Sequence, residues 1–264
     1  MRGRSIHTED MESRIDRKLL DLPILMETSH EIAVVKPSGM ATELSRDPKG
    51  ASLLSRVKAA ASTDCHPLLP HRLDRVARGI VLIALSHDSI AFHNRQIQMR
   101  AWDKIYIARC LAPMDGAMDP LIDTHKLHLR AQAGRSRVVH SGGQQAWTEI
   151  LAITPAPEVD GEIHVLIRLL TGRFHQIRAT MAHLGVPLVD DWLYGTSTGR
   201  TNERFYLEHA ALRFKPFGSL TPSIVHWRED PHREPMNPLL RRCLDELLAQ
   251  WENEAGTWMG GHHA

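Results

Sequence analysis

Apolar residues gather in short runs separated by stretches with helical spacing, which indicates that strands and helices are mixed along the chain. Runs rich in Val, Ile and Leu predict strands at 32–35, 79–85, 104–112, 146–153 and 162–170. Apolar positions three and four residues apart predict helices at 52–61, 91–99, 173–184 and after the helix-start pair Asn237 and Pro238. This order favours an α+β fold around a substantially antiparallel sheet.

The composition restricts the chain to one class of protein. Its 264 residues are 42% apolar and 24% charged, which suffices for one sizeable core. No apolar run approaches the roughly 20 residues that span a bilayer, and the start at Met1 lacks the apolar core of a signal peptide. The widely spaced Cys65, Cys110 and Cys243 exclude a disulfide framework and a cysteine-based zinc site. We therefore expect a cytoplasmic globular protein.

The formal net charge of +1 argues at first against a nucleic-acid partner, since such proteins usually carry a basic excess. The charge is uneven, however: residues 1–31 carry −2 and residues 228–264 carry −3, which leaves +6 on residues 32–227. Two stretches there, 124–148 and 164–189, contain no acidic residue. Their basic residues are Lys126, Arg130, Arg135, Arg137, Arg168, Arg173 and Arg178. Such stretches either neutralise phosphates or form ordinary solvated faces.

The sharpest local feature is His71-Arg72-Leu73-Asp74, followed by Arg75, Arg78 and a strongly apolar strand. A carboxylate close to several cations is held in its ionised form, because opposite charge favours the charged state. An ionised carboxylate suits a nucleophile or a general base. The alternative is a cluster of surface salt bridges on a loop, which contributes little to stability.

Two further segments combine residues that suit nucleic-acid chemistry. In Thr171-Gly172-Arg173-Phe174-His175-Gln176-Ile177-Arg178, a strand is expected to end and a helix to begin, so Arg173 would lie at a helix start that attracts anions. In Lys104-Ile105-Tyr106, Lys104 and Tyr106 would share one face of a strand, where the ring could stack on a nucleobase. The alternatives are a solvated polar helix and a tyrosine in a half-buried sheet.

Together these segments resemble the RluA-type branch of the RNA pseudouridine synthases. His71–Asp74 with Gly79-Ile80 is similar to the HRLD…SGI segment that carries the catalytic aspartate of the family. The other matches are Lys104–Ala108 to KxYxA, Thr171–Arg178 to TGRxHQIR, Val34–Gly39 to KPxG, and Gly185–Gly195 to GxP…GDxxYG. Five segments in the family order, over roughly residues 30–216, are far more specific than any single motif.

The resemblance implies the pseudouridine synthase fold. This is an α+β fold with a mixed, mainly antiparallel central sheet, flanking helices and loops, and an active-site cleft across the sheet. It divides the chain into a polar N-terminal arm at 1–25, a catalytic domain at 26–228, and a C-terminal helix with a loose tail at 229–264. The arm carries apolar residues at helical spacing, namely Met11, Ile15, Leu19 and Leu20.

The implied reaction breaks the C1′–N1 bond of a uridine in ribosomal or transfer RNA, rotates the uracil and rejoins it through C5. No cofactor and no metal are expected. The resemblance makes Asp74 the catalytic carboxylate, either attacking C1′ as in a retaining glycosidase or abstracting a sugar proton. Arg178 is expected to pair with Asp74, and Tyr106 to lie against the flipped uracil and to assist proton removal from C5.

RNA is the expected partner, bound by a monomer with no membrane contact. The target base must leave its stack, and Arg72 is expected to fill the gap because a guanidinium can stack and bind phosphate at once. Arg173, Lys36 and the basic stretch 126–137 are expected to grip the RNA backbone. His175 and Gln176 are the other expected RNA-binding residues.

The chain departs from the family pattern at several positions. Ala77-Arg78 replaces Thr-Ser, Thr180 replaces a common His, and Asp190 stands where Gly usually precedes Asp. Glu208 takes the His place of a Leu-His-Ala segment. None of these positions is Asp74, but Arg78 is expected to affect how RNA docks beside it.

Two rival functions follow from the same residues. A non-catalytic RNA-binding or RNA-folding protein on this scaffold is supported by Ala77-Arg78 alone. A metal hydrolase is suggested by the 17 histidines, yet no H-x-E or HExxH arrangement occurs, and His125 and His128 would point to opposite faces of a strand.

Overall fold

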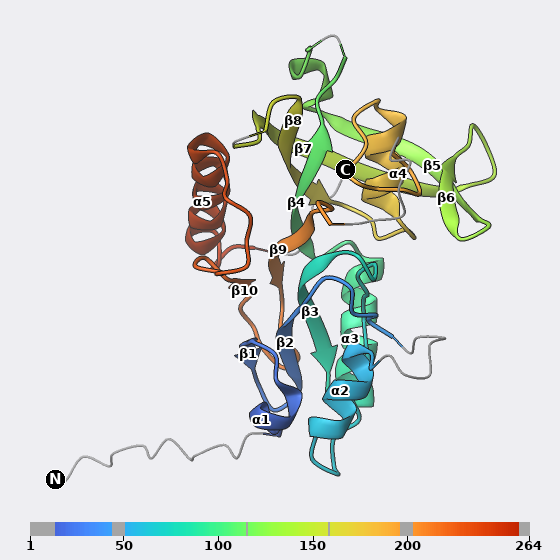
Figure 1. The fold of residues 1–264 in the computed structure, drawn as a ribbon. Coiled ribbons are helices and arrows are strands. Elements are labelled where there is room, and N and C mark those ends of the chain that lie inside the picture. Colours follow the sequence, from blue (N-terminus) through green and yellow to red (C-terminus); the bar gives the residue numbers. More distant parts are fainter. Residues whose placement is uncertain (1–13, 44–50, 115, 158, 196–202, 259–264) are drawn as a thin grey trace, which may run out of the picture.

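The computed structural model describes residues 14–43, 51–114, 116–157, 159–195 and 203–258, and their strands form one sheet (Figure 1). The strand order is β1-β2-β3-β9-β4-β8-β7-β5-β6, with β10 paired to β9. Every pairing is antiparallel except that of β3 with β9, so the predicted α+β fold with a mixed, mainly antiparallel sheet is confirmed. The strands are β1 (Ile24–Glu27), β2 (Glu31–Lys36), β3 (Arg78–Ala84), β4 (Asp103–Leu111), β5 (Thr124–Gln132), β6 (Arg135–Val138), β7 (Gln144–Pro155), β8 (Glu162–Leu169), β9 (Leu207–Phe214) and β10 (Ser223–His226).

Helices cover both faces of the sheet, and β4 shows how the two faces are sorted. Ile105 and Ile107 of β4 pack against the apolar stripe of α5 (Pro238–Asn253). Tyr106 points to the other face, where it joins the core that α2 (Leu53–Ala60) and α4 (Gln176–His183) help to form. This alternation follows from the two-residue period of a strand. The remaining helices are α1 (Arg17–Leu20), α3 (His87–Gln98) and the short 3-10 helix η1 (Asp119–Leu121).

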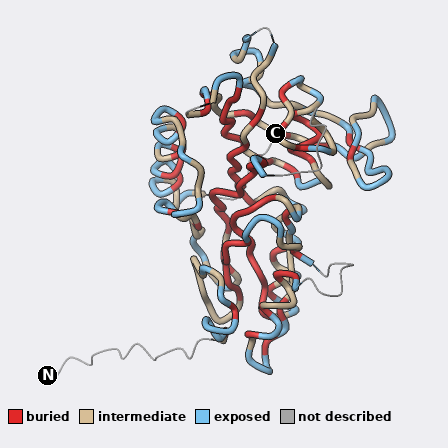
Figure 2. Tube along the Cα trace, viewed as in Figure 1, coloured by how far each residue is buried: buried red, intermediate tan, exposed pale blue. Residues whose placement is uncertain are grey.

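Most predicted elements are present because their local signals are strong. Asn237 caps α5 by accepting a hydrogen bond from the backbone of Leu239, and Pro238 occupies the first helical position, as the sequence predicts. The buried residues of α5 include Leu240, Leu248 and Trp251. Full burial of each such side chain stabilises the fold by about 1.5–3 kcal/mol. Figure 2 shows the buried residues running along the central strands.

Five strands and the start of α4 differ from the sequence prediction. Strand β1, the hairpin β5–β6 and the strands β9 and β10 were not predicted. Strand β5 is mostly exposed, and β9 buries Glu208, His209 and Arg213 among its apolar residues. Helix α4 begins at Gln176 rather than at Arg173, since His175 adopts a left-handed backbone with φ of 51°. The prediction that the helix begins at Arg173 is therefore wrong.

The ends of the described chain are part of the fold. Ile15 and Leu20 are buried in the main core, and β1 begins at Ile24, inside the expected polar arm. At the other end, α5 packs on the sheet, while residues 259–264 of the expected loose tail lie outside the described residues, as does Met11. No helix of the described chain is long and apolar enough to cross a membrane.

The departures Arg78 and Glu208 face each other in the parallel pairing of β3 with β9. Arg78 lies 2.6 Å from Asp230 and 3.6 Å from Glu208, and Arg233 binds Glu208 at 2.7 Å. All four side chains are at least nine-tenths buried. Arg78 thus anchors the segment before α5 and is not among the residues that line the cavity beside Asp74. The expected influence of Arg78 on RNA docking stays a prediction.

Candidate active site

Asp74 lies on an irregular loop that is fixed by the segment after β2. The hydroxyl of Thr42 donates to the carbonyl oxygen of Leu73 at 2.7 Å, and that of Ser38 donates to the carbonyl oxygen of Val76 at 2.6 Å. The loop itself has no helix or strand ladder, so these hydrogen bonds supply the partners that its buried backbone requires. The KPxG-like segment therefore holds the loop of the expected catalytic carboxylate.

Lys36 stands at the centre of this junction with 0% of its surface exposed. Its ammonium donates to the carbonyl oxygens of Ala77, Met40 and Pro37 at 2.6, 2.8 and 2.9 Å. Burial lowers the pKa of Lys36 to about 7, although the charge of Asp74 acts in the opposite direction. Since three carbonyl groups occupy the three N–H donors of an ammonium, the structure places Lys36 where it fixes the loop and not on the surface.

His71 ties the same loop to β3. Its Nε2 accepts a hydrogen bond from the backbone N–H of Leu82 at 2.9 Å, and its ring lies edge-on to Trp102 and His209. Burial, followed by the nearby His209 and Lys104, lowers the pKa of His71 well below its ordinary value. The imidazole is therefore neutral, and its acceptor nitrogen is already used.

Arg178 connects Asp74 to α4. Its Nη1 donates to Asp74 Oδ2 at 3.3 Å, while Nε and Nη2 donate to the two oxygens of the fully buried Asp191 at 2.7 Å each. Such a fork between guanidinium and carboxylate fixes orientation as well as charge. Burial disfavours the cation, but Asp191 and Asp74 more than offset it, so the pKa of Arg178 is raised. The expected pairing of Arg178 with Asp74 is present.

His175 is the residue just before α4 and lies beside the same pair. Its Nε2 is 3.1 Å from Arg178 Nη1 and 3.8 Å from Asp74 Oδ2. A guanidinium only donates, so Nε2 accepts and Nδ1 donates to the hydroxyl of Tyr194 at 3.1 Å. Burial lowers the pKa of His175, with smaller opposing and supporting contributions from Asp74 and Arg178. A neutral His175 therefore holds Arg178 in place from the side.

Tyr106 projects from β4 into the cavity, with its ring stacked on His209 at 4.6 Å between centroids. Burial, and then the charge of Asp74, raise the pKa of Tyr106 well above its ordinary value. The phenol consequently keeps its proton at neutral pH. Lys104, two residues earlier on the same face, also lines the cavity, and burial lowers its pKa to about 8.

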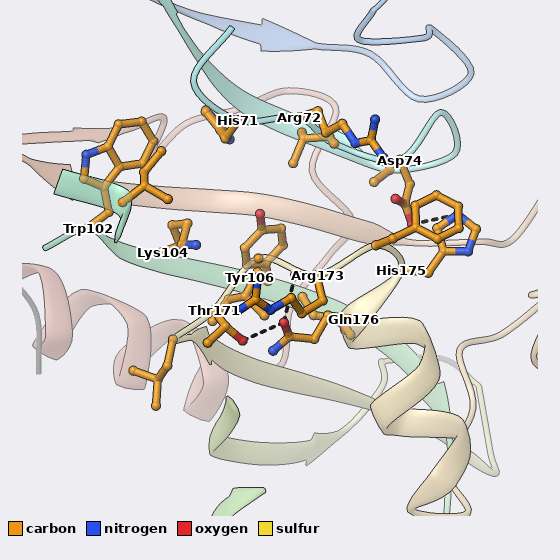
Figure 3. Close-up of a pocket in the computed structure, with 18 of the residues that line it drawn as sticks. His71, Arg72, Asp74, Trp102, Lys104, Tyr106, Thr171, Arg173, His175 and Gln176 are labelled. Carbon is orange, nitrogen blue, oxygen red and sulfur yellow. Dashed lines mark hydrogen bonds and ion pairs between the residues drawn. The ribbon is translucent and has the colours of Figure 1, made fainter. Parts of the chain in front are cut away.

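These groups border one cavity of about 580 Å³, shown in Figure 3. Asp74 and His175 lie at one side of the view, Lys104 and Trp102 at the other, and the Tyr106 hydroxyl points into the space between them. The volume falls within the range of about 300–1,000 Å³ that is usual for small-molecule sites. A single nucleotide is a ligand of that size class. The expected cleft across the sheet thus lies between the Asp74 loop and the Thr171–Gln176 segment.

Arg72 lies at the exposed edge of this cavity. Its guanidinium is 3.4 Å from Glu43 and 5.8 Å from the centre of the Phe174 ring. Both Arg72 and Glu43 are more than half exposed, so this ion pair is weak. Glu43 is a second carboxylate on the cavity wall, which the sequence did not indicate, but it pairs with Arg72 instead of facing Asp74 across the cavity.

Gln176 and Arg173 occupy different environments. Gln176 is 3% exposed, and its amide accepts from Thr171 Oγ1 at 2.7 Å and donates to the carbonyl oxygen of Trp147 at 3.0 Å. Gln176 therefore braces the loop from within the cavity wall, with its polar groups bound inside the protein. Arg173 is exposed at the cavity edge, where its Nε donates to the carbonyl oxygen of Gln145 at 2.9 Å.

The chemistry that this geometry permits is that of one oriented carboxylate. Asp74 is 20% exposed, so it is accessible from the cavity, and Arg178 fixes its Oδ2. Tyr106 offers a protonated phenol and Lys104 a buried amine. Among the described residues, no group of three or more His, Cys, Asp or Glu side chains could hold a metal ion.

Comparison with known proteins decides the family. The family model described as RNA pseudouridylate synthase matches residues 30–183, which include Asp74, Tyr106 and Arg178. The chain belongs to the RNA pseudouridylate synthase family. Members of this family are isomerases that act on RNA, and this chain is one of its RluA-type enzymes.

Two curated relatives share the name dual-specificity RNA pseudouridine synthase RluA. The protein from Vibrio vulnificus is 30% identical over 197 residues, which cover 72% of this chain and 76% of that one. The protein from Yersinia pestis is 31% identical over 176 residues, which cover 65% and 81% respectively. The RNA pseudouridylate synthase family and its RluA-type branch, both expected from the motifs, are thereby confirmed.

A solved structure shows the same fold. Human RNA pseudouridylate synthase domain containing 1 superposes with a TM-score of 0.68 at 20% identity, over 96% of this chain and 98% of that one. The coverage includes the C-terminal segment with α5, so the pseudouridine synthase fold extends over nearly the whole chain.

Sequence reasoning missed the residues that hold the site together. Asp191 was part of a matched motif but was assigned no role, and His209, Trp102 and Thr42 gave no signal at all. Asp190, at the usual glycine position, has φ of 54°, a left-handed backbone that Gly and Asp both tolerate, which explains the family preference. Arg178 and Asp191 carry opposite charges and lie in two matched motifs that follow each other along the chain. This was the one signal in the sequence that could have indicated their contact.

Proposed function

We propose that this protein isomerises specific uridines of ribosomal or transfer RNA to pseudouridine, with Asp74 as the catalytic carboxylate and without a cofactor. The observation that carries the proposal is the ion pair of Asp74 with Arg178, which Asp191 in turn holds at the wall of a nucleotide-sized cavity. Two curated relatives bear the words dual-specificity in their names, which favours more than one RNA substrate.

The proposed reaction is redox-neutral. The C1′–N1 bond breaks, the uracil rotates, a C1′–C5 bond forms, the proton leaves C5, and N1 gains a proton. Asp74 either attacks C1′ as a nucleophile or removes a sugar proton, and its fixed, partly exposed oxygen suits both.

Tyr106 is proposed to lie against the uracil ring. The raised pKa of Tyr106 favours the neutral phenol. We therefore assign Tyr106 the role of packing against the uracil and hydrogen bonding to it, in preference to removing the proton from C5. The stacked His209 behind it keeps the ring in one orientation. Lys104, with a pKa of about 8, is placed to exchange a proton or a hydrogen bond with a carbonyl oxygen of the base.

Base flipping supplies access to the target. Unstacking a base costs a few kcal/mol, and a side chain that occupies the gap offsets part of this cost. Arg72 stands at the cavity edge with an exposed guanidinium, and its weak contacts with Glu43 and Phe174 are easily exchanged for RNA.

The backbone contacts are proposed to come from exposed basic residues. Arg173 lies at the cavity edge, and the β5–β6 hairpin carries Lys126, Arg130 and Arg137 on exposed positions. Lys36 and Gln176 are proposed to support the site from inside, because their polar groups are used within the protein. His175, beside Arg178, is proposed to contact the flipped nucleotide only through its exposed edge.

The test is tritium release from RNA labelled at C5 of uridine and prepared from cells that lack this gene. The wild-type protein is expected to release tritium, and Asp74→Asn is expected to lose at least about 10³-fold in rate, because the amide can neither attack nor accept the proton. RNA affinity of the variant should stay within about threefold of wild type. Asp64→Asn, an exposed aspartate outside the cavity, is the matched control and should behave as wild type. Wild-type activity in Asp74→Asn would refute the proposal.

The alternative is a non-catalytic RNA-binding protein on the same scaffold. Its support in the sequence was Ala77-Arg78, and Arg78 pairs with Asp230 and does not line the cavity, which favours the enzyme. In the same experiment, RNA binding without tritium release from any cellular RNA would restore that alternative.

A further inference from the structure

A cluster of two cations on one tryptophan lies next to the cavity. The guanidinium carbon of Arg100 is 4.0 Å from the centre of the Trp147 ring, and the ammonium of Lys126 is 4.6 Å from it. Lys126 and Trp147 are direct cross-strand partners on β5 and β7, whereas Arg100 follows the end of α3. Three separate elements therefore bring these side chains together.

The cluster is tied to the active-site loop through the backbone of Trp147. Its N–H donates to Thr171 Oγ1 at 2.9 Å, and its carbonyl oxygen accepts from Gln176 Nε2 at 3.0 Å. Arg100 and Arg173 both line the cavity that contains Asp74. Hydrogen bonds thus fix the strand position of Trp147 relative to the cavity, and the two cations lie over its ring.

The charge of the cluster is uncompensated. Within the described residues, no carboxylate lies at ion-pair distance from Arg100, Lys126 or Arg173. Like charges held close together repel each other, and an anion between them relieves this repulsion. The ring attracts both cations through its electron-rich face, so it keeps two flexible side chains in place before a ligand arrives.

Arg100 also adopts a backbone conformation that an arginine seldom has. Its φ of 55° lies in the left-handed region, where glycine would be the unstrained choice after a helix. Trp147, in turn, lies in none of the segments that resemble the family. Neither residue is explained by the packing of the core or by the catalytic groups.

We propose that Arg100, Trp147 and Lys126 form a phosphate clasp, which binds an RNA backbone phosphate next to the flipped uridine. This inference rests on the proposed function, since it takes the cavity as the place of the flipped base. Because two cations already lie over the indole ring of Trp147, we assign this ring the role of holding the cations rather than of stacking on a base. The clasp gives this chain a contact with the nucleotides that flank its target, and therefore an influence on which uridine is chosen.

The experiment measures RNA affinity as a function of salt in an Asp74→Asn background, where no turnover interferes. The probe is unfractionated transfer RNA, and a second series uses single-stranded oligouridylate. Each phosphate contact that a variant removes should flatten the slope of log affinity against log salt by about 0.7 for single strands and about 0.9 for duplex. Arg100→Gln with Lys126→Gln removes the contact with one phosphate and should therefore weaken binding about tenfold at low salt, with the slope flattened by about 0.7 on oligouridylate and about 0.9 on duplex RNA.

Trp147→Leu keeps both charges but removes their support. We expect an affinity loss of about threefold with a slope change of less than about 0.5, because the cations remain but are no longer held. Arg241→Gln with Arg242→Gln is the matched control: these are two exposed arginines on α5, which packs on the opposite face of the sheet, and affinity should stay within about twofold.

The outcomes are distinct. Equal affinity and slope in the clasp variant and the α5 control would overturn the proposal. A loss in Trp147→Leu alone, with no effect of the charge variants, would also overturn it in favour of base stacking. Lys126→Gln by itself, at an exposed position, repeats the test with one charge if the double variant does not fold. If the clasp is confirmed but the wild type releases no tritium, the proposed function fails while RNA binding at the clasp stands.

Discussion

At the scale of single residues, the geometry of Asp74 depends on a carboxylate that never meets the cavity. Asp191 is fully buried and binds two nitrogens of Arg178, which leaves the third free to reach Asp74. A buried charge pair of this kind is a costly arrangement for stability alone. We infer that the pair of Asp191 with Arg178 serves to fix the direction in which the Arg178 guanidinium points.

We predict that Asp191→Asn lowers kcat about 100-fold and changes the KM for RNA less than about threefold, since Arg178 loses the charged fork that fixes its direction and no longer holds Asp74 Oδ2 in one orientation. Steady-state tritium release measures both constants, and thermal unfolding shows whether the variant is folded. Asp190→Asn is the control, because asparagine tolerates the left-handed backbone at that position. Unchanged kcat in a folded Asp191→Asn would contradict the positioning role.

The sequence predicted which residues meet at the cavity better than it predicted their surroundings. Asp74, Tyr106 and Arg178 carry distinctive neighbours in sequence, and the structure brings all three to one cavity. Lys36 and Gln176 were expected at the RNA surface, but their partners are backbone groups that come close only after folding. A local pattern shows which side chains are polar, not which carbonyl groups will satisfy them.

At the scale of elements, β9 joins the two halves of the sheet. It pairs with β3 over two residues only, and a Cβ at Gly79 would come within 2.4 Å of the His209 carbonyl oxygen. Arg78, next to this glycine, extends from the junction to Asp230 and so fixes the chain that leads to α5. Of the two strands of the junction, β3 was predicted from its apolar run, whereas β9 was not, since its buried charged residues interrupt the run.

We predict that Arg78→Gln destabilises the protein by about 3 kcal/mol, because Asp230 and Glu208 remain buried with too little positive charge. Tritium release at a temperature where the variant is folded should stay within about threefold of wild type, since Arg78 does not line the cavity. Urea unfolding measures the stability. Arg95→Gln on the exposed side of α3 is the control, with an expected change below about 0.5 kcal/mol. A smaller loss in Arg78→Gln than in the control would contradict the anchoring role.

At the scale of the whole molecule, the centre of the sheet contains neutral histidines. His209 donates from Nδ1 to the carbonyl oxygen of Ile80 at 2.6 Å, and its Nε2 is buried without a partner. Burial, opposed by the Ile80 hydrogen bond and assisted by Lys104, lowers the pKa of His209 to about 3. The unfolded chain therefore binds a proton at this residue below about pH 6.5, whereas the folded protein does not.

Because the unfolded state takes up that proton first, stability is lost as the pH falls from about 6.5 towards 3. Between about pH 7.5 and pH 5.5, His209 should lower the free energy of unfolding by about 1.4 kcal/mol. His209→Gln should lose this part of the pH dependence, as measured by urea unfolding at both values. His140→Gln at an exposed position is the control and should keep it. Identical pH dependence in wild type and His209→Gln would show that the histidine is not buried neutral.

The distribution of charge over the molecule explains why the net charge of +1 gave little guidance. The acidic C-terminal segment forms α5 on the face opposite the cavity, and the basic stretches form the β5–β6 hairpin and the Thr171–Arg178 segment beside it. The C-terminal segment, with a net charge of −3, and the basic residues that line the cavity thus lie on opposite faces of the sheet, which the net charge of the chain does not show.

The most direct test of the central claim is the mapping of pseudouridines in total RNA from three strains of the source cell. One carries the wild-type gene, one lacks it, and one encodes Asp74→Asn at the native locus. We predict that at least one pseudouridine in ribosomal or transfer RNA is present in the first strain and absent from the other two, with the Asp74→Asn protein present at normal level. Identical maps in the wild-type and Asp74→Asn strains would contradict the account.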